Sequence, residues 1–264
     1  MNASAEHRLY AKNLSQASEN KIHDDDVARR FGFAGALVGG IEVYAYMTHL
    51  PLARWGIDWL ERGTSECRFF KPVYDGKLAV VSAIEAAGAL AITVTSEGET
   101  CARGAVALPP DAAPAPAIPE PAAPPSAKDR PDADETTLAV GRRLSSHPLC
   151  LDRERLQQYL ADVSERDPIY ARENIVHAAF ILKLCNLALK DNVKLAAWIH
   201  VGSTVRHCGI AHAGDTLAAH AVVAANHEKK GHRFVELDAT VVANGTRPLA
   251  QVRHVAIYRI RREG

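Results

Sequence analysis

The sequence predicts an α+β protein that is built from two similar halves. Each half contains one long segment that is apolar almost all round, as expected of a helix enclosed by the rest of its domain. Four strand-like runs separated by turn residues follow each of these segments, which favours an antiparallel sheet beside the helix. The length of 264 residues is sufficient for two domains that each bury a core.

The first half begins its predicted core with an enclosed helix over residues 41–52. Glycine turns, such as those at Gly76, Gly88 and Gly98, then separate the strand-like runs. These runs cover residues 65–70, 77–86, 89–96 and 101–108.

The second half repeats this order after an enclosed helix over residues 178–189. Turns are expected at Gly214 and at Asn244-Gly245. The strand-like runs cover residues 200–208, 216–225, 233–243 and 248–260.

A proline-rich segment separates the halves. Nine of the 14 prolines lie within residues 109–131, mixed with alanine and almost no large apolar residues. Such a composition cannot bury a core and predicts an extended, partly polyproline linker on the surface. We therefore expect one domain over residues 1–108, a linker over residues 109–135 and a second domain over residues 136–264.

A constant offset relates the two halves. Three features of the first half recur 138 residues later: an apolar residue before the helix, an arginine in a strand and a turn glycine. The pairs are Val38 and Val176, Arg68 and Arg206, and Gly76 and Gly214. A fixed spacing across about 40 residues favours an internal duplication. The alternative is that two similar amphipathic patterns coincide.

Composition excludes several classes of function. The 31 acidic and 31 basic residues balance, and no polybasic run occurs, so neither nucleic acid nor an anionic membrane is an expected partner. The apolar stretches are shorter than the roughly 20 residues of a membrane-spanning helix. The first residues lack the apolar core of a signal peptide, which favours the cytoplasm. Five scattered cysteines without a Cys-x-x-Cys pair indicate reduced thiols and no metal site.

Residues 18–47 carry the chemistry of the chain. A polar loop sets His23 between Asn20 and three aspartates, and the pair Gly39-Gly40 then opens the first enclosed helix. An imidazole titrates near neutral pH and can accept or donate a proton. The unpaired N–H groups at a helix start can stabilise developing negative charge, and glycine lets a ligand approach them. Glu42 is unusual in so apolar a helix, because a buried carboxylate must be paired or protonated.

This segment resembles the active-site segment of the MaoC-like (R)-specific enoyl-CoA hydratases of the hot-dog superfamily. The family pattern is Asp-x-Asn-Pro-(apolar)-His, then Gly-Phe, then (apolar)-(apolar)-His-Gly-Met before the central helix. The chain departs from it at Ser18, where the family has its catalytic Asp, at Lys21 in place of Pro, and at Gly39 in place of the second His. The matching residues are Asn20, Ile22, His23, Gly32, Phe33, Leu37, Val38 and Gly40.

The resemblance implies a double hot-dog fold, in which two curved antiparallel sheets each wrap a central helix. The helices would begin near Gly40 and Ala178, and the sheets would join edge to edge into one continuous sheet. Two hot-dog domains in one chain are equivalent to a hot-dog dimer, and whether the chain forms a further homo-oligomer is left open.

The resemblance also implies roles for individual residues. In the family, the His and the Asp hold the water that adds across the double bond of a 2-enoyl thioester, which places His23, Asn20 and Ser18 at the catalytic centre. The N–H of Gly40 would meet the thioester carbonyl. Substrate-binding positions would be Gly39, Glu42 and His177, the last because it stands directly before the second helix.

Each of these residues also has a simpler interpretation. Asn20 and His23 would cap and brace the loop before a short helix over residues 24–31. The glycine pair would allow close packing of the helix start against a strand. Glu42 would be an acid or base, or would neutralise a nearby arginine such as Arg68. Glu19, one position from Ser18, is a candidate to replace the missing carboxylate.

Three functions remain open at this stage. The leading one is a hydratase or dehydratase acting on a 2-enoyl thioester of coenzyme A or acyl carrier protein, with no separate cofactor and no metal. A thioesterase of the same superfamily needs only a base for water and the helix-end N–H groups. A non-catalytic acyl-CoA binding or interaction protein would account for Ser18 and Gly39. The basic cluster at residues 229–233 is a solvated turn or a contact for coenzyme A phosphates.

Overall fold

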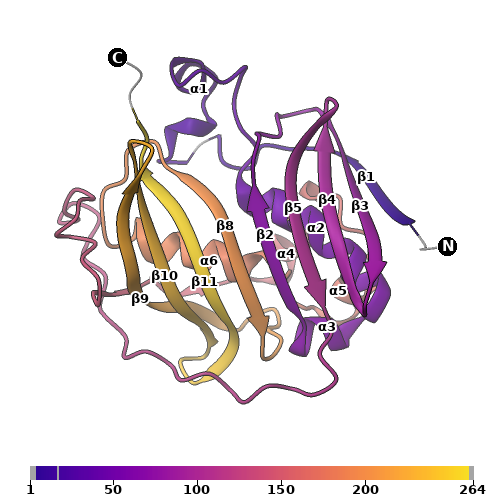
Figure 1. Ribbon diagram of the computed structural model, residues 1–264. Helices are drawn as coiled ribbons and strands as arrows, with labels where there is room; N and C mark the ends of the chain where they lie inside the picture. The colour runs from indigo at the N-terminus through magenta and orange to yellow at the C-terminus, as the bar shows by residue number, and fades with distance from the viewer. Residues whose placement is uncertain (1–3, 17, 262–264) are drawn as a thin grey trace.

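The fold is known from a computed structural model, which describes residues 4–16 and 18–261 (Figure 1). Its described residues form one antiparallel sheet of 11 strands in the order β1-β3-β4-β5-β2-β8-β11-β10-β9-β6, with β7 also pairing with β9. The strands of the first half are β1 (Ser4–Tyr10), β2 (Thr64–Phe69), β3 (Leu78–Ala86), β4 (Ala89–Ser96) and β5 (Glu99–Ala107). Those of the second half are β6 (Arg143–Ser145), β7 (Leu149–Cys150), β8 (Ile199–His207), β9 (Thr216–Lys229), β10 (His232–Ala243) and β11 (Arg247–Arg259).

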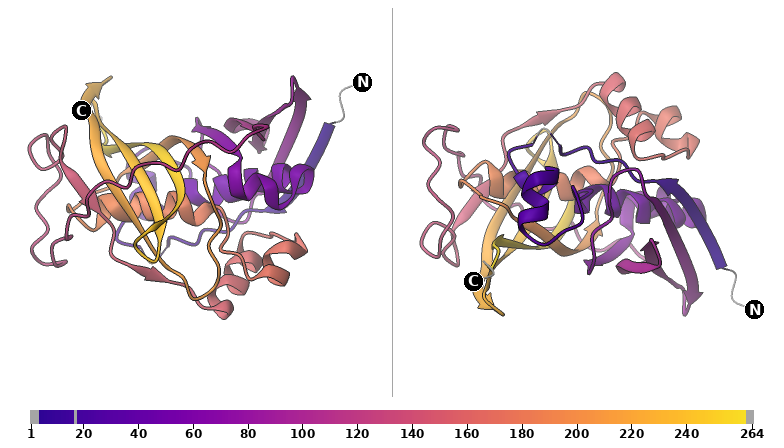
Figure 2. Two further views of the ribbon diagram at one scale, coloured as in Figure 1. Left: turned by 90° about the horizontal axis from the view of Figure 1, so that it is seen from below. Right: turned by 90° about the horizontal axis from the view of Figure 1, so that it is seen from above.

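The two long apolar helices lie along one face of this sheet (Figures 1 and 2). They are α2 (Gly40–Trp55) and α6 (Ala179–Lys190), and most of their side chains are buried. Helix α2 ends at Gly56, whose φ of 60° is a conformation that few other residues adopt at low cost. The shorter helices are η1 (Lys21–His23), α1 (Asp25–Arg30), α3 (Ile57–Arg62), α4 (Arg153–Asp162) and α5 (Pro168–Glu173).

The halves repeat one topology, as the constant offset predicts. The order β3-β4-β5-β2 of the first half corresponds to β9-β10-β11-β8 of the second, and the two meet where β2 pairs with β8. Helix α2 begins at Gly40, and Ala178, 138 residues later, is the N-cap of α6. The prediction of one continuous sheet around two central helices is confirmed. The sequence pattern missed the edge strands β1, β6 and β7 and the shorter helices α3, α4 and α5.

The proline-rich segment runs over the surface as an extended chain, and residues 109–126 contain neither helix nor strand. Hydrogen bonds nevertheless fix its course. The side chain of Arg62 donates to the carbonyl oxygen of Pro109, Arg206 donates to Pro114 at 3.0 Å, and the Thr240 hydroxyl donates to Ala117 at 3.0 Å. Carbonyl groups that face solvent in a polyproline chain therefore bind side chains of both halves here.

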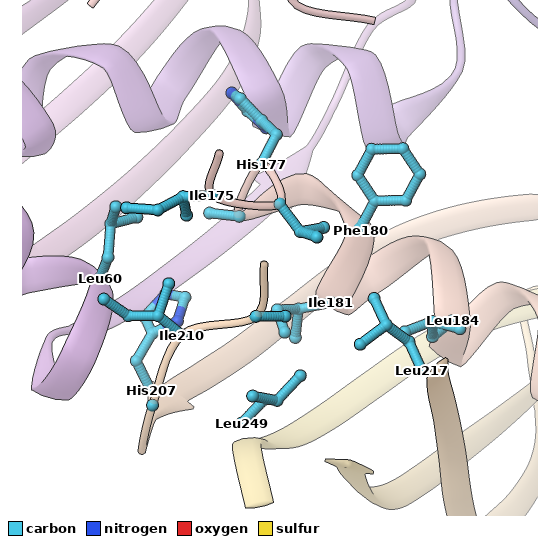
Figure 3. A pocket seen from close by; sticks show the side chains of 14 residues that line it. Leu60, Ile175, His177, Phe180, Ile181, Leu184, His207, Ile210, Leu217 and Leu249 are labelled. Carbon is cyan, nitrogen blue, oxygen red and sulfur yellow. The ribbon is translucent and has the colours of Figure 1, made fainter. Parts of the chain in front are cut away.

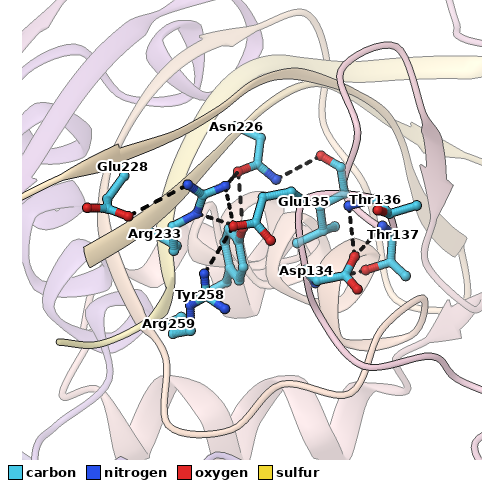
Figure 4. A network of polar contacts seen from close by, with 10 residues as sticks. Asp134, Glu135, Thr136, Thr137, Asn226, Glu228, Arg233, Tyr258 and Arg259 are labelled. Carbon is cyan, nitrogen blue, oxygen red and sulfur yellow. Dashed lines mark hydrogen bonds and ion pairs between the residues drawn. The ribbon is translucent and has the colours of Figure 1, made fainter. Parts of the chain in front are cut away.

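A network of charged residues attaches the end of this segment to the sheet (Figure 4). Glu135 accepts from Arg233 at 2.6 Å and from Arg259 at 3.1 Å, while Asn226 donates to the carbonyl of Leu138 at 3.0 Å. The guanidinium of Arg233 therefore already forms ion pairs with carboxylates. This favours a structural role for Arg233 over contact with a phosphate.

Four of the five buried histidines among the described residues are the most deeply enclosed. His177, His200, His207 and His254 each expose 6% or less of their surface. Burial disfavours the charged imidazolium, so it lowers the pKa of His177 and His207 to about 4, that of His200 to about 3 and that of His254 well below its ordinary value. All four side chains are neutral at physiological pH.

These histidines should make the protein sensitive to acid. Because their pKa is lower in the folded than in the unfolded chain, their contribution to stability is complete above pH 6.5 and is lost as the pH falls towards 4. Urea unfolding at pH 7.5 and pH 5 should show a loss of about 1 to 2 kcal/mol per buried histidine. The variant His207→Leu should take up one proton fewer on unfolding, so its unfolding free energy should depend less steeply on pH. An unfolding free energy that is equal at both pH values in the unmodified chain would contradict this account.

Candidate functional site

A cavity of about 430 Å³ lies where the start of α2 meets the second half of the sheet. Its volume falls within the range of small-molecule sites. The polar loop and the helix start contribute Ser18, Asn20, His23, Gly39, Gly40 and Glu42. The second half contributes Asn186, Trp198, His200 and Ile257. The structure therefore brings six of the seven residues singled out in the sequence to one cavity.

His23 faces this cavity as a neutral imidazole. Its Nδ1 lies 2.7 Å from the carbonyl oxygen of Leu37, which can only accept, so the ring proton is on Nδ1. The other nitrogen, Nε2, carries the lone pair and lies 3.4 Å from the side-chain amide nitrogen of Asn20. Burial lowers the pKa of His23 below its ordinary value of 6.5. The geometry suits a group that accepts a proton at Nε2.

Asn20 attaches the polar loop to the second half. Its side-chain nitrogen donates to the carbonyl oxygen of Trp198 at 3.0 Å, and its side-chain oxygen accepts from the N–H of Trp198 at 3.3 Å. Ser18 lies on the same loop, where its hydroxyl donates to the carbonyl oxygen of Asn20 at 3.2 Å. The cap of α1 is Asp24, whose carboxylate accepts from two helix N–H groups. Asn20 thus bridges the halves, both Asn20 and His23 line the cavity, and Asp24 supplies the cap.

The N-terminus of α2 presents backbone N–H groups to the cavity. The carbonyl oxygen of Gly39 accepts from Glu42 and Val43, and no described residue accepts from the N–H of Gly40. A Cβ atom on Gly40 would lie 3.1 Å from Nδ1 of His200 and 3.2 Å from the ring of Phe69. Glycine at this position therefore satisfies tight packing and leaves an open N–H donor at the same time.

Glu42 reaches back over the helix start. Its carboxyl oxygen Oε2 occupies the space that a side chain on Gly39 would need, so glycine at position 39 makes room for this carboxyl group. Among the described residues, no hydrogen-bond partner reaches Oε2. Glu42 is only 4% exposed, and burial raises its pKa to about 7. The alternative that Glu42 neutralises Arg68 is wrong, because Arg68 is exposed and pairs with Glu66 at 2.7 Å.

Two other candidate residues lie elsewhere. Glu19 does not line the cavity and forms an ion pair with Arg130 at 3.0 Å, so the structure does not place it as a substitute for the missing carboxylate. His177 also lies outside the cavity. It stands just before α6, where its Nδ1 accepts a hydrogen bond from the N–H of Ala179 at 3.1 Å. It borders a small apolar cavity of about 20 Å³. In Figure 3 its ring points away from most of the other residues that line this cavity. The rings of Tyr159 and Tyr170 pack against it there.

Sequence reasoning missed His200, which lines the main cavity from β8. No motif in the sequence distinguishes His200 from the other histidines of the second half. No group of three metal-ligating side chains occurs within residues 4–16 and 18–261. The helices of that part of the chain also include none with the length and apolar character needed to cross a membrane.

Comparison with solved structures identifies the fold. A protein from Mycobacterium tuberculosis described as having a double hot-dog fold superimposes with a TM-score of 0.64 at 16% identity, covering 97% of this chain and 96% of that one. The chain has a double hot-dog fold. A MaoC domain protein, described as a dehydratase, from Chloroflexus aurantiacus matches with a TM-score of 0.63 at 13% identity over 98% of this chain and 96% of its own.

A further solved structure matches less closely. An oleoyl thioesterase from Lactobacillus plantarum gives a TM-score of 0.52 at 10% identity, with 98% of both chains covered. No protein-family model matches the sequence, and no curated protein matches it either. At these identities the likeness establishes the fold, while the chemistry has to be argued from the site.

The buried carboxyl group of Glu42 should be measurable through stability. Its pKa is higher in the folded chain, about 7, than in the unfolded chain, so its contribution to stability is complete below pH 4.5 and is lost as the pH rises through 7. The variant Glu42→Gln should therefore raise the unfolding free energy at pH 9 by up to about 3 kcal/mol relative to the unmodified chain. At pH 4 the two proteins should be equally stable. A variant that is less stable at pH 9 would show that the ionised carboxylate is stabilised in the fold.

Proposed function

We propose that the protein adds water to, or removes it from, a 2-enoyl thioester carried by coenzyme A or acyl carrier protein. The observation that carries this proposal is the presence in one cavity of a neutral imidazole, whose Nε2 has only a long 3.4 Å contact to the amide of Asn20, and of an N–H at a helix start with no described partner. The first group can accept a proton from water, and the second can bind the oxygen on which negative charge develops.

The reaction can be followed through these two groups. The N–H of Gly40 donates to the thioester carbonyl oxygen, while the attacking water donates to Nε2 of His23. As the water oxygen bonds to C3, its proton moves to His23 and the electrons of the double bond move to the carbonyl oxygen as an enolate. The enolate then takes a proton at C2 from the imidazolium, which returns His23 to its neutral form. Dehydration is the same sequence in reverse.

The cavity also suits the rest of such a substrate. Apolar side chains, including Ile22, Val38, Ile41 and Ile257, line it beside the polar groups. This combination accommodates an acyl chain next to a reacting carbonyl group. Because the thioester carrier belongs to the substrate, the proposal requires no separate cofactor.

A thioesterase is the second candidate, because the same base and N–H donor would serve the attack of water on the thioester carbonyl. Ser18 favours it, since thioester hydrolysis does not require the carboxylate that the MaoC-like pattern has there. A panel of enoyl- and acyl-CoA esters separates the candidates when enoyl absorbance and free thiol are followed together. The proposal predicts loss of enoyl absorbance without thiol release. Binding without either change would indicate a non-catalytic acyl-CoA protein.

The variant His23→Ala should reduce turnover by roughly two to four orders of magnitude, the usual effect of losing a general acid or base. Circular dichroism should show an unchanged fold, because the ring makes only two polar contacts, to Leu37 and Asn20. His147→Ala, at an exposed histidine, is the matched control and should keep full activity. Equal activities of the two variants would remove His23 from the mechanism.

The variant Ser18→Asp restores the carboxylate of the MaoC-like pattern. If the protein hydrates enoyl thioesters, a second acceptor for the attacking water should raise the rate of crotonyl-CoA hydration. The rate of thioester hydrolysis should not rise. Ser18→Asn provides a side chain of similar size without the charge and should show no gain. A rise in thiol release in place of hydration would favour the thioesterase.

A further inference from the structure

A chain of four hydrogen-bonded side chains in the second half, three of them buried, ends at the main cavity. Nε2 of His254 lies 2.8 Å from the side-chain oxygen of Asn186, and Nδ1 of His254 lies 2.9 Å from the hydroxyl of Ser203. The same hydroxyl lies 2.9 Å from Nε2 of His200. The remaining nitrogen, Nδ1 of His200, has no partner among the described residues, and His200 lines the cavity.

The direction of every hydrogen bond in this chain is fixed. The oxygen of Asn186 can only accept, so Nε2 of His254 carries the proton and its Nδ1 accepts from Ser203. The Ser203 oxygen is then left to accept from Nε2 of His200. Both imidazoles are neutral, because burial lowers the pKa of each. His200 therefore holds a lone pair on Nδ1.

A β-bulge places His200 at the cavity. In the pairing of β8 with β11, Gly202 stands opposite Val255 and His200 opposite Ala256, so Val201 is left without a partner. Residues three apart in a regular strand point to opposite faces. The extra residue brings His200 and Ser203 to the same inner face, as bulges commonly re-aim a side chain beside a site.

Nδ1 of His200 lies close to the backbone group that is proposed to bind the thioester. It lies within 3.1 Å of the point that a Cβ on Gly40 would occupy, beside the N–H proposed to bind the thioester carbonyl. Asn20 also joins the His23 loop to Trp198, two residues before His200. Two neutral imidazoles, one from each half, thus line the same cavity, and Nδ1 of His200 lies buried there without a described partner.

We propose that His200 contacts the ligand, with Nδ1 accepting a hydrogen bond from the oxygen at C3: the hydroxyl of a 3-hydroxyacyl thioester, or the water that becomes it. Ser203 and His254 are positioning residues, which hold the proton on Nε2 of His200. The inference rests on the proposed function and narrows its substrate to the 3-hydroxyacyl and 2-enoyl pair. It also assigns a second acceptor for water in a chain with Ser18 at the carboxylate position.

Binding of two pantetheine thioesters tests the inference independently of the carrier. Isothermal titration should show the (R)-3-hydroxybutyryl ester binding about tenfold more tightly than the butyryl ester, since they differ by one hydroxyl and its hydrogen bond. His200→Leu should remove this preference and leave the affinity for the butyryl ester unchanged. His207→Leu, at a buried histidine of the same strand outside the cavity, should keep the preference.

A second variant and a spectroscopic readout distinguish contact from a structural role. Ser203→Ala retains the imidazole of His200 but removes the hydroxyl that holds its proton on Nε2. This variant should therefore weaken the preference for the hydroxybutyryl ester, and it provides a test even if His200→Leu does not fold. In protein labelled with ¹⁵N-histidine, the resonance of Nδ1 of His200 should move on addition of the hydroxybutyryl ester and stay in place with the butyryl ester. A histidine that only supports the fold would respond equally to both.

The outcomes separate this inference from the function on which it rests. If the unmodified chain binds neither ester, the proposed function fails and the inference fails with it. If the chain binds both esters without preference, or if folded His200→Leu keeps the preference, the inference alone is overturned. If folded His200→Leu loses affinity equally for both esters, the inference is also overturned, because that result indicates a role of His200 in shaping the cavity.

Discussion

The pairing of β2 with β8 is the interaction on which the rest of the structure depends. Each of these strands would be an exposed edge in an isolated half, with unpaired N–H and C=O groups. Their pairing, from Thr64 with Arg206 to Arg68 with Gly202, closes both edges and makes one sheet of the two halves. Gly202 is needed there, because a Cβ atom at this position would lie 2.7 Å from the carbonyl oxygen of Cys67.

The cavity opens where this pairing ends. Beyond Gly202 the strand bulges and turns His200 inward, and beyond Arg68 the first half contributes Phe69 to the lining. Asn20 closes the same region from the other side by binding the backbone of Trp198. A site made in this way belongs to neither half alone, so the junction that stabilises the sheet also assembles the candidate chemistry.

The two halves have diverged at their helix starts. In the first, Gly39 leaves space that the carboxyl group of Glu42 fills, and the neighbouring N–H faces a cavity large enough for a ligand. In the second, the equivalent position is His177, and tyrosines from the segment before α6 pack against its ring. The corresponding space is about 20 Å³, too small for a thioester. A duplicated scaffold thus carries one candidate site, as in a dimer in which only one subunit keeps its pocket.

The sequence predicted the elements that depend on periodicity and missed those that depend on a partner strand. The two helices and eight principal strands follow from apolar patterns within each segment. The β-bulge at Val201 does not, because it is defined by which residue of β11 stands opposite, and the inward position of His200 follows only from the bulge. The His23 loop was found through its motif. The suggested pairing of Glu42 with Arg68 was wrong, because the sequence alone does not show which face of its strand Arg68 occupies.

The electrostatic character of the cavity explains why so few groups can perform the chemistry. His23 and His200 are neutral because burial lowers the pKa of each, and Glu42 is close to half protonated at neutral pH because burial raises its pKa to about 7. The two imidazoles therefore add no charge beside an enolate, and the protonated form of Glu42 adds none either. Stabilisation of that charge is left to backbone dipoles at the start of α2, which act strongly where water is excluded and require no reorganisation. The glycine pair makes those dipoles accessible, and the neutral imidazoles provide acceptors for water without adding a charge that would have to be desolvated.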